Sequence, residues 1–175
     1  NPNKENLRFT MIHCQTARKD QIEKMAQLKM IPSIFVGHVN YWGDVHMKNF
    51  GPVRGSRVSP AKDALDAGLG YNFHTDTPVV RPDMLHAVWT AVNRVTRSGA
   101  VIGADQRIGV YDALKGVTIN AAYEYFEENE KGSIKPGKRA DLVILSDNPL
   151  KVDAMTIKDI QVLETIVDGE IVFTK

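Results

Sequence analysis

The sequence has 175 residues, of which 25% are charged, and its 22 lysine and arginine residues balance 21 aspartate and glutamate residues. This length allows one medium-sized domain with a buried core. Because no block of like charge stands out, the composition argues against binding to nucleic acid or to a membrane surface, and the apolar runs are too short to span a bilayer.

The cysteine content and the first residues bear on where the protein acts. Cys14 is the only cysteine, so an internal disulfide is excluded and a reducing, cytoplasmic location is expected. The polar start, residues 1–9, lacks the apolar centre of a secretory signal. The first residue is asparagine rather than methionine, which suggests processing or a piece of a longer protein.

In chain order, the first elements predict strands that alternate with helices. Residues 7–13 form an apolar, β-prone segment, and residues 20–30 carry an apolar stripe at helical spacing. Residues 31–38 predict a second strand that begins with Ile-Pro, where the missing N–H of proline is tolerated. Residues 39–58 predict a long irregular loop, which in a compact domain is often functional.

The same alternation continues through the middle of the chain. Residues 59–68 predict a helix with serine at its cap and glycine at its end, and residues 69–74 predict a third strand. A strong helix follows over residues 82–99, and residues 107–128 are again helical, with a break near residues 118–120. This order predicts a parallel sheet built from right-handed βα units.

The pattern changes near residue 131, where Pro-Gly and Asn-Pro turns begin. Asp168-Gly169 predicts a hairpin turn. Short antiparallel strands are predicted over residues 140–145, 161–167 and 170–174. We therefore predict two parts, an α/β part over residues 1–130 and a small β part over residues 131–175.

Polar side chains follow all three strands of the α/β part at the points where the strands end. They are His13, His38, and the pair His74 and Asp76. Because the carboxyl ends of parallel strands form the ligand-binding face, we expect these side chains to lie close together. Imidazoles and a carboxylate suit a divalent metal such as zinc, for which His13 and Asp76 are the clearest ligands and His38 the next. An aspartate beside such a metal can also carry a proton.

The segment Tyr41–His46 has two interpretations. Trp42 and its neighbouring aromatic residue could line a substrate pocket, with Asp44 and His46 as a second polar cluster. Alternatively, the loop packs its own aromatic side chains. Strand alternation aims Cys14 away from the site, which predicts a buried thiol.

Several segments resemble one known family. Residues 118–122 and 131–145 resemble, almost letter for letter, the helix-to-sandwich junction of the third group of the amidohydrolase superfamily, the set related to N-substituted formamide deformylase. Residues 163–172 resemble its terminal hairpin, residues 75–78 the Ser-Asp-x-Pro at the end of its eighth barrel strand, and residues 93–99 the helix that follows.

The resemblance implies an α/β fold made of part of a TIM-type (β/α)8 barrel. The last three strands of the barrel and their helices would lie in residues 1–130, followed by the C-terminal strands of a small β-sandwich in residues 131–175. A full barrel takes about 250 residues. The chain therefore resembles a C-terminal portion, which we expect to be inactive in isolation and to be ordered by the missing N-terminal part of the barrel or by self-association.

The resemblance also implies roles for individual residues. His13 would be the metal-binding histidine of the sixth strand, and Asp76 the aspartate of the eighth, both metal ligand and catalytic proton carrier. His38, His74 and Trp42 would lie on the substrate side. In an alternative register, His13 lies on the fifth strand and His38 on the sixth, and both histidines are metal ligands.

The implied activity is hydrolysis of a carbon–nitrogen bond in a small amide or formamide by water activated on a divalent metal, most simply zinc. The metal is expected to be absent or only partly bound in this chain alone. One alternative is a non-catalytic binding or regulatory protein on the same scaffold. Another is an autonomous α/β domain without a site.

Overall fold

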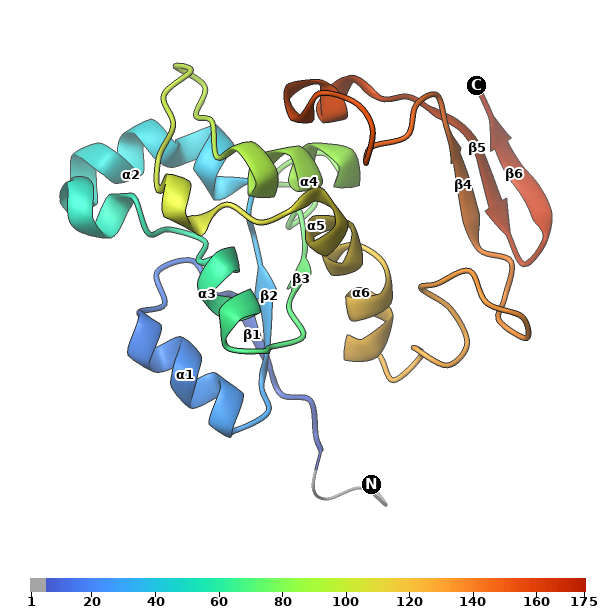
Figure 1. Ribbon diagram of the computed structural model, residues 1–175, viewed down its shortest axis with the longest axis horizontal. Coiled ribbons are helices and arrows are strands. Elements are labelled where there is room, and N and C mark those ends of the chain that lie inside the picture. The colour runs from blue at the N-terminus through green and yellow to red at the C-terminus, as the bar shows by residue number, and fades with distance from the viewer. Residues whose placement is uncertain (1–5) are drawn as a thin grey trace.

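Three short parallel strands organise the first part of the protein. The computed structural model describes residues 6–175. Strands β1 (Thr10–His13), β2 (Ile31–Ile34) and β3 (Asn72–Phe73) pair in the order β1-β2-β3 (Figure 1). The predicted parallel sheet is confirmed, although β3 is shorter than the predicted strand. The described residues contain no closed barrel.

The register brings the carboxyl ends of these strands to one edge. His13 pairs with Ile34, and Ile34 pairs with Phe73. Past the strands, the Phe35 N–H donates to the His13 carbonyl and the His74 N–H donates to the Ile34 carbonyl, both at 3.2 Å. All four residues of β2 are buried, as expected for the central strand of a covered parallel sheet.

The helices around the sheet are α1 (Lys19–Gln27), α2 (His38–Gly55), α3 (Ala61–Asp66), α4 (Met84–Asn93), α5 (Val110–Gly116) and α6 (Ile119–Glu124) (Figure 1). Side chains of α1, α3, α4 and α5 form one apolar core with the sheet, whereas Val39 of α2 packs with Val58 and Ile102 in a separate cluster. The break between α5 and α6 lies close to residues 118–120, as predicted. Within residues 6–175, no helix combines the length and apolarity needed to cross a membrane.

The loop predicted over residues 39–58 is wrong, because most of this segment forms α2. The helix is interrupted at Gly51, where φ is 74° and ψ is 171°. Its glycines and Pro52 lower helix propensity and obscure the pattern. The missed signal is a ring-bearing residue at every fourth position, which places these residues on one helix face. They are His38, Trp42, His46 and Phe50.

Helix α4 ends at Asn93 rather than at residue 99 as predicted, because the chain turns back on itself after it. Arg94 adopts a left-handed conformation with φ of 54°, and the chain folds back so that Val95 and Val101 form a bridge. The last residue of this 94–103 turn must be glycine, because a Cβ atom at Gly103 would lie 1.9 Å from the Ser56 carbonyl oxygen.

The Arg94 guanidinium is fully buried and binds four backbone carbonyls. It donates to Ile102 at 2.9 Å, to Ser59 and Ser56 at 3.1 Å each, and to Val58 at 2.8 Å. Burial lowers the pKa of Arg94 to about 10, so the side chain stays charged at neutral pH. Arg94 thus holds the chain that leaves the end of α2.

The same turn also holds the beginning of α2. The Asp44 carboxylate accepts hydrogen bonds from the hydroxyls of Thr96, at 2.8 Å, and Ser98, at 2.7 Å. Four residues before Asp44, at one helical turn's distance, the Asn40 side-chain amide donates to the Val95 carbonyl at 2.8 Å. These contacts and those of Arg94 attach α2 at both ends to the 94–103 turn.

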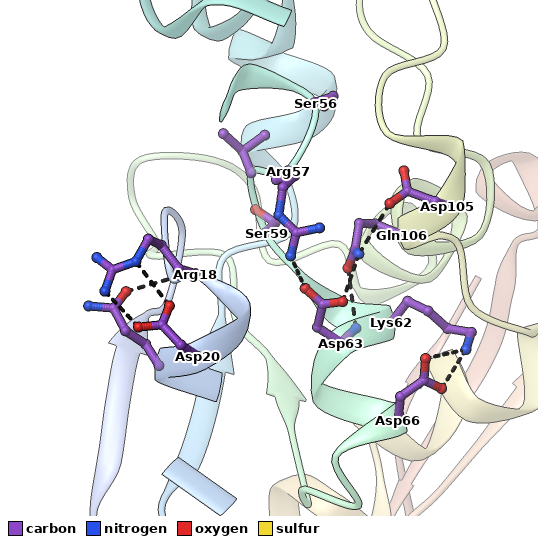
Figure 2. A network of polar contacts seen from close by, with 12 residues as sticks. Arg18, Asp20, Ser56, Arg57, Ser59, Lys62, Asp63, Asp66, Asp105 and Gln106 are labelled. Carbon is purple, nitrogen blue, oxygen red and sulfur yellow. Dashed lines mark hydrogen bonds and ion pairs between the residues drawn. The ribbon is translucent and has the colours of Figure 1, made fainter. Parts of the chain in front are cut away.

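A polar network connects α3 to the short helix η1 (Ala104–Gln106) that follows the turn (Figure 2). The Asp63 carboxylate accepts from Arg57 and, at 3.0 Å, from the Gln106 amide. The side-chain amide oxygen of Gln106 accepts in return from the Asp63 backbone N–H at 3.2 Å. Gln106 is buried, so this paired contact sets the position of α3 beneath the turn.

The C-terminal residues form a second, antiparallel sheet of order β4-β5-β6, as predicted. Its strands are β4 (Leu142–Leu145), β5 (Val162–Val167) and β6 (Glu170–Thr174). Helices α4, α5 and α6 lie between the two sheets (Figure 1). The short helix η2 (Ala154–Asp159) contacts α4, where the Trp89 indole N–H donates to the Met155 carbonyl at 2.9 Å.

Arg8 ties the segment before β1 to the segment after α6. Its guanidinium pairs with both carboxylate oxygens of Glu128, at 2.6 and 2.9 Å. It also lies over the rings of Tyr123, at 3.7 Å, and Phe126, at 4.0 Å. The hydrogen bond from Arg8 lowers the pKa of Glu128 below its usual range.

Replacing Arg94 should strongly destabilise the fold. Arg94→Met keeps much of the side-chain volume but leaves several buried carbonyls without a donor, so we expect a loss of about 3 kcal/mol in the free energy of unfolding. Urea denaturation followed by circular dichroism measures it. The exposed Arg81→Met is the matched control and should change stability by less than about 0.5 kcal/mol. Equal losses in the two variants would contradict the role of Arg94.

Replacing Glu128 should change how stability depends on pH. A carboxyl whose folded pKa is lowered stabilises the protein above its unfolded pKa of about 4.3, and this contribution disappears as the pH falls through the folded pKa. Glu128→Gln should therefore lower stability at pH 7 by roughly 1 kcal/mol and have little effect at the acid end of the folded range. Urea midpoints across this range test it, with the exposed Glu23→Gln as control. A difference independent of pH would exclude the ion pair as the cause.

Candidate metal centre

Three side chains suited to metal binding meet at the carboxyl edge of the parallel sheet. His13 ends β1, and His74 and Asp76 follow β3; one ligand atom from each lies within 4.8 Å of the other two. The His13 Nε2 atom is 3.8 Å from an Asp76 carboxylate oxygen, and these two side chains are 40% and 43% exposed. The His74 Nε2 atom is buried, so the group opens to solvent on the side of His13 and Asp76.

Backbone strain coincides with this group. The φ angle is 62° at His13, 45° at Cys14 and 52° at Asp76, in the left-handed region that side chains other than glycine disfavour. Such conformations cost roughly 1–3 kcal/mol each and cluster at functional sites. The turn at Cys14 also places its thiol in the core, as predicted, where burial raises its pKa to about 11.

His74 has one nitrogen bonded and one nitrogen free. Its Nδ1 atom lies 3.1 Å from the Ser33 hydroxyl, whereas its Nε2 atom is buried without a hydrogen-bond partner. Burial lowers the pKa of His74, so the ring is neutral at pH 7. If Nδ1–H donates to Ser33, Nε2 carries an unused lone pair, which is the usual arrangement of a metal-binding histidine with an outer hydrogen-bond partner.

The donor set therefore fits a divalent transition metal. Two imidazole nitrogens and one carboxylate oxygen are ligands that zinc takes in catalytic sites, and the unpartnered Nε2 of His74 is a polar atom that such an ion would satisfy. His74, predicted on the substrate side, thus joins the predicted ligands His13 and Asp76 in one cluster. The sequence signal for this was its spacing of two residues from Asp76.

His38 and Trp42 lie beside this group on the first turns of α2. The His38 ring centre is 6.1 Å from that of His13 and 4.9 Å from that of Trp42. Phe35 packs edge-on against His38 at 4.7 Å. The pKa of His38 is lowered to about 4, mainly by burial and to a smaller extent by the neighbouring histidines. This ring is therefore neutral at pH 7.

His46 and Gln15 extend the polar group, and Gln15 was missed from the sequence. The His46 Nε2 atom lies 3.2 Å from His38 Nδ1 and 2.9 Å from the Gln15 side-chain nitrogen. The His46 ring stacks on Phe50 with an interplanar angle of 5°, and burial lowers its pKa. Asp44 does not join this cluster, because its carboxylate is bound by the 94–103 turn.

Comparisons with known proteins point to one family. A sequence model described as the amidohydrolase family matches residues 1–173. N-substituted formamide deformylase from Arthrobacter pascens is 33% identical over 162 residues, which cover 90% of this chain and 29% of that protein. The chain thus spans less than a third of the length of this relative.

Solved structures agree at the level of the fold. An uncharacterized metal-dependent hydrolase from Pyrococcus horikoshii OT3 has a TM-score of 0.70 and 27% identity, over 83% of this chain and 30% of that chain. An adenosine deaminase from Xanthomonas campestris, solved with bound zinc, has a TM-score of 0.69 over 97% of this chain and 38% of its own. At 19% identity, the latter shows the fold alone.

Metal titration should separate the two roles considered for His74. If its Nε2 is a ligand, His74→Ala should weaken zinc binding at least about tenfold, as should His13→Ala. Competition with a chromophoric chelator measures the affinity. His86→Gln, which alters a histidine outside the cluster, should leave the affinity unchanged. If zinc binding survives the loss of His74 but not the loss of His13, His74 is not a ligand and its role is on the substrate side.

Proposed function

The chain belongs to the amidohydrolase family, and on that premise we propose that the protein is a metal-dependent hydrolase of carbon–nitrogen bonds in small amide-type substrates. The observation that carries the proposal is the cluster of His13, His74 and Asp76, with a buried nitrogen of His74 left without a partner. The similarity to a formamide deformylase supports an amide or formamide as the substrate class.

The proposed architecture places β1, β2 and β3 as consecutive strands of a (β/α)8 barrel, the sixth, seventh and eighth. Because the resemblance assigns Asp76 to the eighth strand, the direct parallel pairing of the three strands in chain order supports this register over the one that starts from the fifth strand. In this proposal residues 1–130 belong to the barrel, and residues 131–175 supply the C-terminal strands of a β-sandwich. The rest of the barrel would come from sequence outside this chain, or self-association would cover the open edges.

His13, His74 and Asp76 would hold the ion, for which zinc is proposed from the mixed nitrogen and oxygen donors. When bound, a divalent metal polarises a carbonyl group and lowers the pKa of water. The half-exposed Asp76 carboxylate accepts a proton from the attacking water and delivers it to the departing nitrogen. His38 and Trp42 flank the substrate from α2.

The described chain alone is proposed to be inactive. It offers three candidate ligands at a half-open edge, and its relative is more than three times as long. The longer protein is therefore the right material for assays of turnover, whereas binding and spectroscopic measurements apply to this chain as well.

Removing the carboxylate should abolish turnover. In the whole protein, Asp76→Asn takes away the group that carries the proton, so we expect kcat on N-substituted formamides and simple amides to fall by about 10³-fold or more. Initial rates together with the metal content measure the effect. The exposed Asp147→Asn is the matched control and should retain full activity. Full activity of Asp76→Asn with normal metal content would overturn the proposed mechanism.

A further inference from the structure

The contacts of His46 constrain which nitrogen of His38 carries the proton. A side-chain amide nitrogen only donates hydrogen bonds. Because the Gln15 nitrogen lies 2.9 Å from His46 Nε2, this atom of His46 must be the acceptor, and His46 is protonated at Nδ1. The Gln15 backbone is itself held in place, since its carbonyl accepts from the Ser59 N–H at 2.7 Å.

The second contact of the same atom then determines the state of His38. His38 Nδ1 lies 3.2 Å from His46 Nε2, and two lone pairs facing each other at this distance repel. His38 Nδ1 is therefore assigned the hydrogen, and it shares the single lone pair of His46 Nε2 with the shorter Gln15 contact in a three-centre hydrogen bond. In the neutral ring, the other nitrogen, Nε2, is left unprotonated and can only accept.

The rings around these two histidines hold them in this arrangement. His46 is stacked parallel on Phe50, and His38 contacts Phe35 and Trp42 at centroid distances of 4.7 and 4.9 Å. In the described part of the chain, the hydrogen bond of the His38 ring is made through Nδ1, and Nε2 has no partner. Because Nε2 is also not among the buried atoms that lack a partner, it reaches the surface and is open to a ligand.

We propose that Gln15 and His46 are positioning residues that hold His38 as a hydrogen-bond acceptor facing the substrate. Resting on the proposed hydrolase function, this assigns a substrate class: amides or formamides that keep an N–H group, which His38 Nε2 can bind, in preference to N,N-disubstituted ones. His38 binds the substrate, whereas His46 and Gln15 act through His38 without touching it.

The protonation pattern can be measured without turnover. Long-range ¹H–¹⁵N correlation spectra of the ¹⁵N-labelled protein at pH 7.5 distinguish the two neutral forms of each of its five histidines. His38→Gln and His46→Gln assign the signals. We expect both histidines to be protonated at Nδ1. Protonation of either one at Nε2 would mean that the Gln15 amide is reversed, and would overturn the proposal.

Gln15→Glu is the sharpest variant, because a carboxylate of the same size only accepts hydrogen bonds. His46 Nε2 should become protonated and His38 should switch to the form protonated at Nε2. The exposed Gln27→Glu is the matched control and should leave both rings unchanged. If Gln15→Glu does not fold, Gln15→Met removes the donor without adding charge and should leave His38 and His46 as a mixture of both forms. Unchanged rings in the folded variant would exclude Gln15 as the determinant.

Selectivity tests the substrate class separately. In the whole protein, kcat/KM is compared for N-methyl and N,N-dimethyl amides of one acyl group. We expect the ratio to favour the N–H substrate and to fall by about tenfold in Gln15→Glu, the size of one hydrogen bond. An unchanged ratio would overturn the substrate assignment. Absence of turnover on both amides would instead contradict the proposed hydrolase function, while the spectra still decide the state of His38.

Discussion

The pairing of Ile34 on both of its sides is the contact on which the candidate site depends. This fully buried residue is aligned with His13 of β1 and with Phe73 of β3. The alignment sets His13 next to His74 and brings Asp76 within reach of both. Because successive side chains of a strand point to opposite faces, a slip of one residue in either pair would turn one of these groups away. The buried β2 strand prevents such a slip.

Beside these strand ends three histidine rings are neutral, and the negative charge lies on Asp76. Burial keeps His38, His46 and His74 neutral at physiological pH, and neutral imidazole is the form that binds metals and accepts hydrogen bonds. Asp76 supplies a negative charge at the exposed side of the group. The edge of the sheet thus offers one anionic oxygen among uncharged nitrogen atoms, which suits a divalent cation and a neutral substrate.

Much of this arrangement could be predicted from strand ends. Parallel strands collect their last residues at one edge, so His13 and Asp76 could be paired from the sequence. The path of α2 could not, because Gly43, Gly51 and Pro52 reduce local helix propensity and tertiary packing overrides it. Gln15 escaped notice for a different reason: its partner comes from another element, and no local spacing links the two.

The 94–103 turn has a consequence for the space beside His38 and Trp42. Asp44, near the beginning of α2, accepts hydrogen bonds from this turn, and Arg94, the first residue of the turn, donates to carbonyls beyond the end of α2. The turn itself continues directly from α4. Because α2 is interrupted at Gly51, its two segments are held separately. Moving the first segment would break the hydrogen bonds of Asp44, and moving the second would break the buried ones of Arg94. A bulkier molecule beside His38 would have to gain its room from a smaller side chain at Trp42, rather than from displacement of the backbone.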